Sequence, residues 1–206
     1  MHIALITPFF PTANKWASGV GTHYELLAQQ LTTQGHQVTV VHLSQGTQGT
    51  ETPSGYRVDH CGIKLPAMLA RLCGQRWDLH RALEELLLPV AAAIWLFKQS
   101  LKGSLPNAIE STNYGMVGLP FHWLLPQLVH LVRVSTLSGQ ISGSSFPLSS
   151  VFLRMMASAE RTYLEVAPQL ITHTLQHRRE IAHVLKIAPF HIPIIPHGLR
   201  LPTLPS

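Results

Sequence analysis

The sequence predicts an α/β fold: a single Rossmann-like domain with a mostly parallel sheet and helices on both faces. Short apolar runs alternate with helical patterns along the chain, and the stretch from Ile3 to Val41 has the order strand, glycine turn, helix, strand. Such alternation makes successive strands parallel and places the connecting helices on the sheet faces. The 206 residues, 46% hydrophobic and 12% charged, suit one domain with a substantial core. We assign residues 1–195 to this domain and residues 196–206 to the start of an interdomain linker or tail.

The opening unit is the clearest local pattern. The apolar run Ile3–Ile6 predicts a buried strand, and Val38–Val41 predicts the next one. Between them, Thr22 is placed to cap a helix and Gly35 to end it. The apolar stripe of this helix has i, i+3, i+4, i+7 spacing and consists of Tyr24, Leu27, Ala28 and Leu31.

The remaining elements follow from the same two periodicities. Strands are expected at 56–60, 108–110, 128–134 and 169–172, with an extended piece at 191–195. Helices are expected at 65–101, 116–125, 151–166 and 174–186, the first interrupted around Gly74 and at Pro89 and the last capped by Thr174. Polar, glycine-containing stretches predict loops at 44–55 and 138–145.

Composition restricts the class of protein. The net charge of +5 and the pI near 9.6 suit a phosphate-bearing ligand, an anionic membrane surface or nucleic acid, without deciding among them. Cys61 and Cys73 form no CxxC motif and are interpreted as reduced thiols of a cytosolic protein. The N-terminus lacks a signal-peptide pattern, and no apolar stretch is long enough to predict a spanning helix.

Several catalytic motifs are missing or incomplete. A dinucleotide site needs G-x-G-x-x-G, but Gly19-Val-Gly21 is followed by Tyr24 at the third position, and no acidic residue ends the second strand. There is no P-loop and no G-x-S-x-G elbow. The densest histidine group, His173, His177 and His183, lacks the regular spacing of a metal site, so we predict no metal.

Gly19, Val20, Gly21 and Thr22 are the candidate anion-binding residues. They lie between a buried strand and a helix, where backbone N–H groups and the helix dipole favour negative charge. Glycine also lets a ligand approach the backbone closely. The alternative is that the two glycines only permit a tight turn before the helix.

The segment 65–101 has two interpretations. Leu86–Phe97 is almost entirely apolar, which is typical of a core helix. Basic residues flank this apolar part, as they do in helices that lie on a membrane surface. They are Lys64, Arg71, Arg76, Arg81, Lys98 and Lys102. A cytoplasmic protein with a peripheral membrane contact is therefore kept as an alternative.

Four segments, in this order, resemble the N-terminal domain of family 4 glycosyltransferases of GT-B fold. The first is I-T-P-F-F-P…G-V-G-T-H with its continuation Y-E-L-L-A-Q-Q-L…G-H-Q-V-T-V-V. The others are Pro106–Gly115, Val132-Arg-Val-Ser-Thr136 and Ile194-Ile-Pro-His-Gly-Leu199. The resemblance covers nearly the whole chain. It implies a metal-free enzyme that moves a sugar from a nucleotide sugar to an acceptor with retention at the anomeric carbon.

The resemblance also assigns residues. The loop Gly19–Thr22 would face the donor pyrophosphate, which makes the nucleotide diphosphate sugar a substrate and leaves no cofactor. The residues that would face a glycan or lipid-linked acceptor are Glu110, Asn113, Tyr114, Ser135 and Thr136. Ser135 stands where many relatives carry a histidine, so a histidine-dependent acceptor role is in doubt. Glu110 could equally be an ion-pair partner, and Asn113 only a turn residue.

In the family, the donor nucleotide and the basic pair that neutralises its phosphate belong to a C-terminal domain. We therefore expect this chain to be inactive or very weak without such a donor domain, supplied in cis or in trans, and we expect no nucleic-acid partner. The alternative function is a non-catalytic module that binds a glycan, a lipid-linked sugar or a partner chain.

Overall fold

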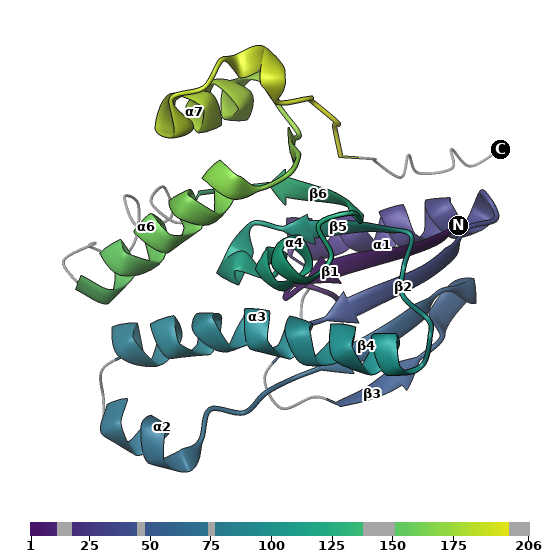
Figure 1. Ribbon diagram of the computed structural model, residues 1–206, viewed down its shortest axis with the longest axis horizontal. Helices are drawn as coiled ribbons and strands as arrows, with labels where there is room; N and C mark the ends of the chain where they lie inside the picture. The colour runs from purple at the N-terminus through teal and green to yellow at the C-terminus, as the bar shows by residue number, and fades with distance from the viewer. Residues whose placement is uncertain (12–17, 45–47, 74–76, 138–150, 198–206) are drawn as a thin grey trace, which may run out of the picture.

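The computed structural model describes residues 1–11, 18–44, 48–73, 77–137 and 151–197. Its seven strands form one sheet in the order β3-β4-β2-β1-β5-β6-β7 (Figure 1). Neighbouring strands are parallel except for the pair β3 and β4, which is antiparallel. The predicted mostly parallel α/β domain is confirmed.

The strands are β1 (His2–Thr7), β2 (Gln37–His42), β3 (Gln48–Glu51), β4 (Arg57–Cys61), β5 (Ala108–Thr112), β6 (Val129–Val134) and β7 (Leu170–Thr172). The helices are α1 (Gly19–Thr33), α2 (Ala67–Cys73), α3 (Trp77–Leu101), α4 (Leu119–Leu124), α6 (Val151–Val166) and α7 (Leu175–Leu185). Short 3₁₀ turns lie at Pro53–Gly55, Tyr114–Met116 and Pro189–His191.

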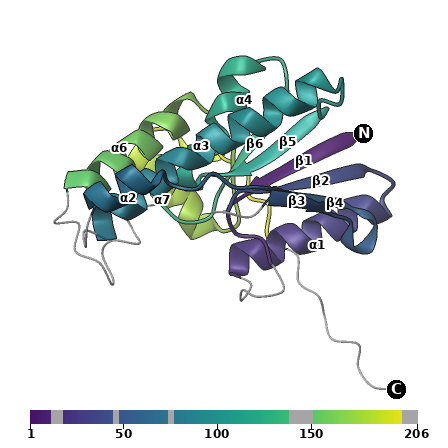
Figure 2. The ribbon, with the colours of Figure 1, turned by 90° about the horizontal axis from the view of Figure 1, so that it is seen from below.

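Alternating side chains of the central strands build a core on each face of the sheet. Leu5 of β1 packs with Tyr24 and Ala28 of α1 on one face. Ala4 and Ile6 of the same strand belong to a second cluster on the opposite face, to which α3 contributes Ala91, Ala92, Trp95 and Leu96. α1 therefore covers one face, and α3 and α4 cover the other (Figure 2). Period-two alternation produces this division.

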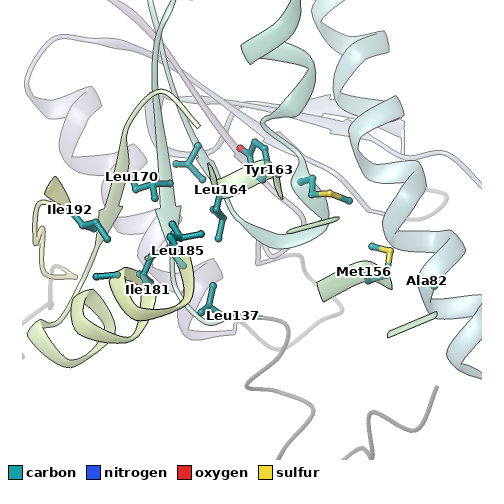
Figure 3. Packing of buried hydrophobic residues seen from close by; sticks show 13 residues of the cluster. Ala82, Leu137, Met156, Tyr163, Leu164, Leu170, Ile181, Leu185 and Ile192 are labelled. Atoms are coloured by element: carbon teal, nitrogen blue, oxygen red, sulfur yellow. The ribbon is translucent and has the colours of Figure 1, made fainter. Parts of the chain in front are cut away.

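A third cluster lies at the β6–β7 end of the sheet (Figure 3). Val132 and Val134 of β6 pack with Tyr163 and Leu164 of α6 and with Ile181 of α7. The cap predicted for α7 is confirmed, because the Thr174 hydroxyl accepts a hydrogen bond from the His177 N–H at 3.1 Å. This cluster holds the carboxyl end of β6 in place, where part of the candidate site lies.

Some predicted boundaries differ from the structure. The predicted loop 44–55 contains the edge strand β3, whose side chains are all exposed and which pairs through its backbone. Pro89 does not interrupt α3, because Leu88 before it and Ala91 after it pack into the same cluster and hold the helix together. The helix predicted at 116–125 begins only at Leu119, after the 3₁₀ turn. Gly74 and the loop predicted at 138–145 lie outside the described residues.

The extended piece predicted at 191–195 is only partly extended. It begins inside the 3₁₀ turn Pro189–His191, and Ile194 then forms a parallel bridge with Thr172 at the end of β7. The backbone of Thr172 bonds to both Pro193 and Ile195. The chain therefore ends its described course along the edge of the sheet, next to β7.

A buried histidine makes the stability of this fold dependent on pH. His130 of β6 is 4% exposed, and its Nε2 lies 2.8 Å from the Ser111 hydroxyl. Burial, with a smaller contribution from His122, lowers the pKa of His130 from 6.5 to about 4. The unfolded chain therefore binds more protons than the folded one between these two values. Consequently, the unfolding free energy falls as the pH drops through this window.

We expect His130 to account for a loss of about 2 kcal/mol of unfolding free energy between pH 7 and pH 5, at about 1.4 kcal/mol per pH unit below 6.5. Urea unfolding at both pH values, compared with His130→Gln, isolates this contribution. The variant should lose less stability on acidification than the wild type. An identical loss in both proteins would contradict the assignment.

Candidate functional site

The predicted site residues lie where the path of the chain through the sheet reverses. From β1 the chain moves outward to β2 and β4, then returns across the sheet to β5 on the other side of β1. β1 and β5 are parallel neighbours and end at Thr7 and Thr112. In open α/β sheets the loops diverge at such a point and leave a crevice for ligands at the carboxyl ends of the strands. The segments after β1 and β5 therefore flank the candidate site.

The N-terminus of α1 forms one wall. Ser18 has an extended backbone, and its hydroxyl accepts a hydrogen bond from the Gly21 N–H at 3.0 Å. The predictions are corrected in two respects: Ser18 rather than Thr22 caps the helix, and the glycines form its first turn rather than a loop. The N–H groups of Gly19 and Val20 have no carbonyl partner within a helix that begins here. No acidic side chain lies in this first turn, so the helix end can accept an anion.

A close backbone approach fixes α1 against the segment after β1. A Cβ added at Gly21 would lie 2.5 Å from the carbonyl oxygen of Phe9, so glycine is required for this packing. A Cβ added at Gly19 would meet nothing within 4 Å. The Phe9 ring in turn packs edge-on against Tyr114, with ring centroids 4.7 Å apart. The segments after β1 and β5 are thus in direct contact, as a shared crevice requires.

A buried ion pair joins β5 to β6. Glu110 of β5 is 8% exposed and Arg133 of β6 is 2% exposed. Nε of Arg133 donates to Oε1 of Glu110 at 2.6 Å, and Nη2 donates to Oε2 at 3.4 Å. Nη1 donates to the carbonyl oxygen of Ile195 at 2.9 Å. One guanidinium therefore joins two strands to the segment that precedes the predicted linker.

The surroundings of Glu110 keep it ionised. Burial alone would raise the pKa of Glu110, but the adjacent His23 imidazole and the Arg133 guanidinium outweigh this effect and hold the pKa below its usual value. His23 Nε2 lies 3.8 Å from Glu110 Oε1. Burial, together with the Glu110 charge, raises the pKa of the Tyr24 hydroxyl well above its usual value. A ligand hydroxyl that reached Glu110 would have to share its oxygens with Arg133.

Asn113 joins the ends of β5 and β6. Its amide nitrogen donates to the carbonyl oxygen of Thr136 at 2.8 Å and to the carboxylate of Glu160 at 2.6 Å. Its amide oxygen accepts from the Ser135 N–H at 3.2 Å. Both amide hydrogens are used, so Asn113 is a positioning residue here. Tyr114 and Thr136 are partly exposed, and a direct acceptor contact stays a prediction for them.

The Ser135 hydroxyl is buried and has no hydrogen-bond partner among the residues that the structure describes. It lies next to Thr136, at the same end of β6. The predicted residues Asn113, Ser135 and Thr136 are therefore neighbours at the ends of two adjacent strands, while Glu110 lies within β5 and bonds to Arg133 of β6.

Histidines far apart in the sequence stack beside this ion pair. The rings of His23 and His197 are 4.3 Å apart and nearly parallel, and His173 lies 4.6 Å from His197 and 4.5 Å from His177. Burial and the neighbouring positive groups lower the pKa of His197 to about 4. His173 and His177 thus lie together next to His197. Within the described ranges, no three His, Cys, Asp or Glu side chains are arranged to hold a metal ion.

Sequence reasoning missed Arg133 and the stacked histidines. A signal for Arg133 was available, because it is the charged residue in the apolar strand 129–134 and lies beside a strand that contains Glu110. The histidine stack had no such signal, since His23, His173 and His197 come from three different segments. His23 of α1 is buried.

Solved structures similar to this chain include GT-B glycosyltransferases. Apo UGT2 from Phytolacca americana matches with a TM-score of 0.55 and 12% identity over 96% of this chain and 51% of that one. TcCGT1 in complex with UDP matches with a TM-score of 0.55 and 14% identity over 96% and 50%. Arabidopsis thaliana UGT89C1 complexed with UDP-L-rhamnose matches with a TM-score of 0.53 and 14% identity over 99% and 53%.

The chain spans about half the length of these structures, so it has the fold of half of a GT-B enzyme. No protein-family model matches the chain. No curated protein matches it in sequence. At these identities the likeness establishes the fold and nothing further. None of the helices in the described part of the chain is both long and apolar enough to cross a bilayer.

Proposed function

We propose that the chain is the acceptor-side half of a GT-B glycosyltransferase similar to family 4. In this proposal the whole enzyme transfers a sugar from a nucleotide diphosphate sugar to a glycan or a lipid-linked acceptor. The observation that carries the proposal is the N-terminus of α1, which lies at the β1–β5 switch point and has no acidic side chain in its first turn. The half-length match to GT-B structures, two of them named with UDP or a UDP-sugar, supports it.

The first turn of α1 is the proposed contact for the donor diphosphate. The N–H groups of Gly19 and Val20 would donate to phosphate oxygens, and the exposed Thr22 hydroxyl would add a third donor. Gly19 is exposed, with open space where a Cβ would be, so a ligand can approach its backbone. Charge-assisted bonds of this kind are stronger than neutral ones.

The ends of β5 and β6 are the proposed acceptor surface. Tyr114 and Thr136 would contact the acceptor directly, and the Ser135 hydroxyl is a further donor if the acceptor displaces the side chains that cover it. Asn113 and the Glu110–Arg133 pair would set the positions of these groups rather than react. The reactive centre lies between this surface and the donor.

The departure of the nucleoside diphosphate needs charged groups from another domain. A departing nucleoside diphosphate requires positive charge to stabilise it. Arg133 is already bonded to Glu110 and Ile195. In the proposal a C-terminal donor domain, in cis or in trans, supplies the basic pair, and transfer proceeds without a metal and with retention. The chain alone would then turn over donor slowly or not at all.

Titration calorimetry of this chain with UDP and with uridine tests the proposal. We expect UDP to bind at least about tenfold more tightly, because a charged hydrogen bond contributes about 1.5–3 kcal/mol and uridine has no phosphate to form one. This preference should weaken with added salt. Equal affinities for UDP and uridine would contradict the diphosphate contact. Ordinary release of UDP from a UDP-sugar by this chain alone would contradict the need for a second domain.

A further inference from the structure

The outward face of α3 is apolar from Leu86 to the last residue of the helix, Leu101. The residues Leu86, Val90, Ile94, Phe97 and Leu101, which we call the α3 stripe, are each between 44% and 73% exposed. At 100° per residue these five positions fall within one narrow sector of the helix. Ala92, Trp95 and Leu96, which pack against the sheet, lie on the other side of the helix. α3 is therefore apolar both toward the core and away from it.

Such a second apolar face is unusual on a water-exposed helix. A surface helix ordinarily presents charged and polar residues opposite its buried side. Contiguous exposed apolar surface of this kind marks an interaction site. α3 lies on the face of the sheet opposite α1 (Figure 2), and the side chains of the α3 stripe are exposed rather than covered by the rest of the domain.

The charges around the stripe identify the partner. Lys98 lies in the last turn of α3, and Lys102 directly follows Leu101, the last residue of the helix. The exposed charged side chains described in α2, in α3, in the segment leading to α2 and in the turn after α3 are all basic: Lys64, Arg71, Lys98 and Lys102. Glu84 and Glu85 are half-buried, and Glu84 is paired with His80 at 2.8 Å. A positive border around an apolar strip matches an anionic lipid surface.

A cavity beside the stripe adds a place for a headgroup. It has a volume of about 290 Å³ between the β3–β4 edge and α3, and Arg57, Lys98, Lys102 and Ile94 are among its lining residues. Three basic side chains, those of Arg57, Lys98 and Lys102, therefore line the same cavity as Ile94 of the stripe. Asp59 also lines the cavity, but its oxygens already accept from Thr50, Arg57 and Trp95. The cavity therefore favours phosphate oxygens over a cation.

We infer that the α3 stripe and its basic border dock the protein onto an anionic bilayer surface, with α3 lying in the interface plane. The site is separate from the crevice at the carboxyl ends of β1 and β5, so the inference does not depend on sugar transfer. A second copy of the chain is a less suitable occupant, because it would bring two stripes with basic borders together.

Co-sedimentation with phosphatidylcholine vesicles, with and without phosphatidylglycerol, tests this inference. We expect binding to the phosphatidylglycerol vesicles that decreases with salt and little binding to the neutral ones. Phe97→Ser should weaken partitioning about tenfold, because a large apolar side chain would no longer be buried in the interface. The matched control is Phe190→Ser. Phe190 is 75% exposed, but it lies in the 3₁₀ turn Pro189–His191 and not in the α3 stripe. This variant should bind as the wild type does.

The double variant Lys98→Gln/Lys102→Gln should lose about thirtyfold on anionic vesicles and nothing on neutral ones, since each lysine near such a surface is worth about 1 kcal/mol. Urea midpoints equal to that of the wild type would show that all variants are folded. Vesicle binding that does not depend on lipid charge or on salt would overturn the inference. Equal binding by Phe97→Ser and Phe190→Ser would also overturn it. So would a concentration-dependent dimer in sedimentation velocity that Phe97→Ser abolishes.

Discussion

Replacing Arg133 with alanine should lower the unfolding free energy by about 3–5 kcal/mol, the usual cost of leaving a buried charge without its partner. The substitution removes both hydrogen bonds to Glu110 and the bond to the Ile195 carbonyl oxygen. Glu110, which is 8% exposed in the wild type, would lose its guanidinium partner and keep His23 as a basic neighbour. Urea unfolding followed by circular dichroism measures the loss, which is a large part of the stability of a typical domain.

The exposed pair Arg161 and Glu165 provides a matched control. It has a similar 2.9 Å contact, but both side chains are more than 40% exposed. Arg161→Ala should therefore change stability by no more than about 0.5 kcal/mol. The combined variant Glu110→Gln/Arg133→Met should be more stable than Arg133→Ala, because no buried charge is left. A loss in Arg133→Ala no larger than that in Arg161→Ala would contradict the proposed role of the pair.

Gly21→Ala should cost about 2–3 kcal/mol, at the upper end of the range for overpacked sites. The new methyl group would lie 2.5 Å from the Phe9 carbonyl oxygen, which belongs to the backbone and cannot move aside as a side chain can. α1 must therefore shift away from the segment after β1. That shift also moves the N–H groups of the first turn, so UDP binding should weaken in the protein that remains folded.

Gly19→Ala, two residues away, is the control for this prediction. Open space surrounds a Cβ at Gly19, and alanine is a better helix former than glycine. Its unfolding free energy should equal that of the wild type or exceed it by up to about 1 kcal/mol. Thermal unfolding of both variants gives the comparison. Equal stability of the two variants would show that the close approach at Gly21 does not constrain α1.

The fold was largely predictable because the apolar residues of its core recur along the sequence with the period of a strand or of a helix. The runs Ile3–Ile6 and Val38–Val41 became the adjacent strands β1 and β2, and the helix between them ends before Gly35 as expected. β3 could not be predicted from such patterns. Its residues Gln48–Glu51 are polar and exposed and show no strand periodicity, so their pairing with β4 makes them a strand. Likewise, the packing of α3 on the sheet outweighed the local effect of Pro89.

The candidate site was predictable in its position but less so in its details. Gly19 to Thr22 and Ser135 do lie at the carboxyl end of the sheet, whereas β5 continues to Thr112 and Glu110 lies within it rather than at its end. However, the partners of Glu110 and Asn113 depend on strand order, which a single sequence does not reveal. Arg133 becomes the natural partner of Glu110 only once β6 is known to lie beside β5. The stacking of His23 on His197 depends further on the return of the chain along β7.

These details change which residues are expected to touch a ligand. The amide group of Asn113 forms hydrogen bonds with Thr136, Ser135 and Glu160. The carboxylate of Glu110 accepts a hydrogen bond from Arg133. The groups proposed to contact a ligand are the backbone N–H groups at the start of α1 and the partly exposed side chains of Tyr114 and Thr136. The central claim is therefore about backbone donors rather than about reactive side chains.

The most direct measurement of this claim is the UDP affinity of Gly19→Pro compared with that of Gly19→Ala. Proline is well tolerated at the first helical position, and the extended backbone of Ser18 suits a residue that precedes proline. Proline removes one N–H, whereas alanine keeps it. We predict that Gly19→Pro binds UDP about tenfold more weakly than Gly19→Ala, with unchanged uridine affinity and an unchanged unfolding midpoint. Equal UDP affinity in the two variants would contradict the claim that the start of α1 binds the donor diphosphate.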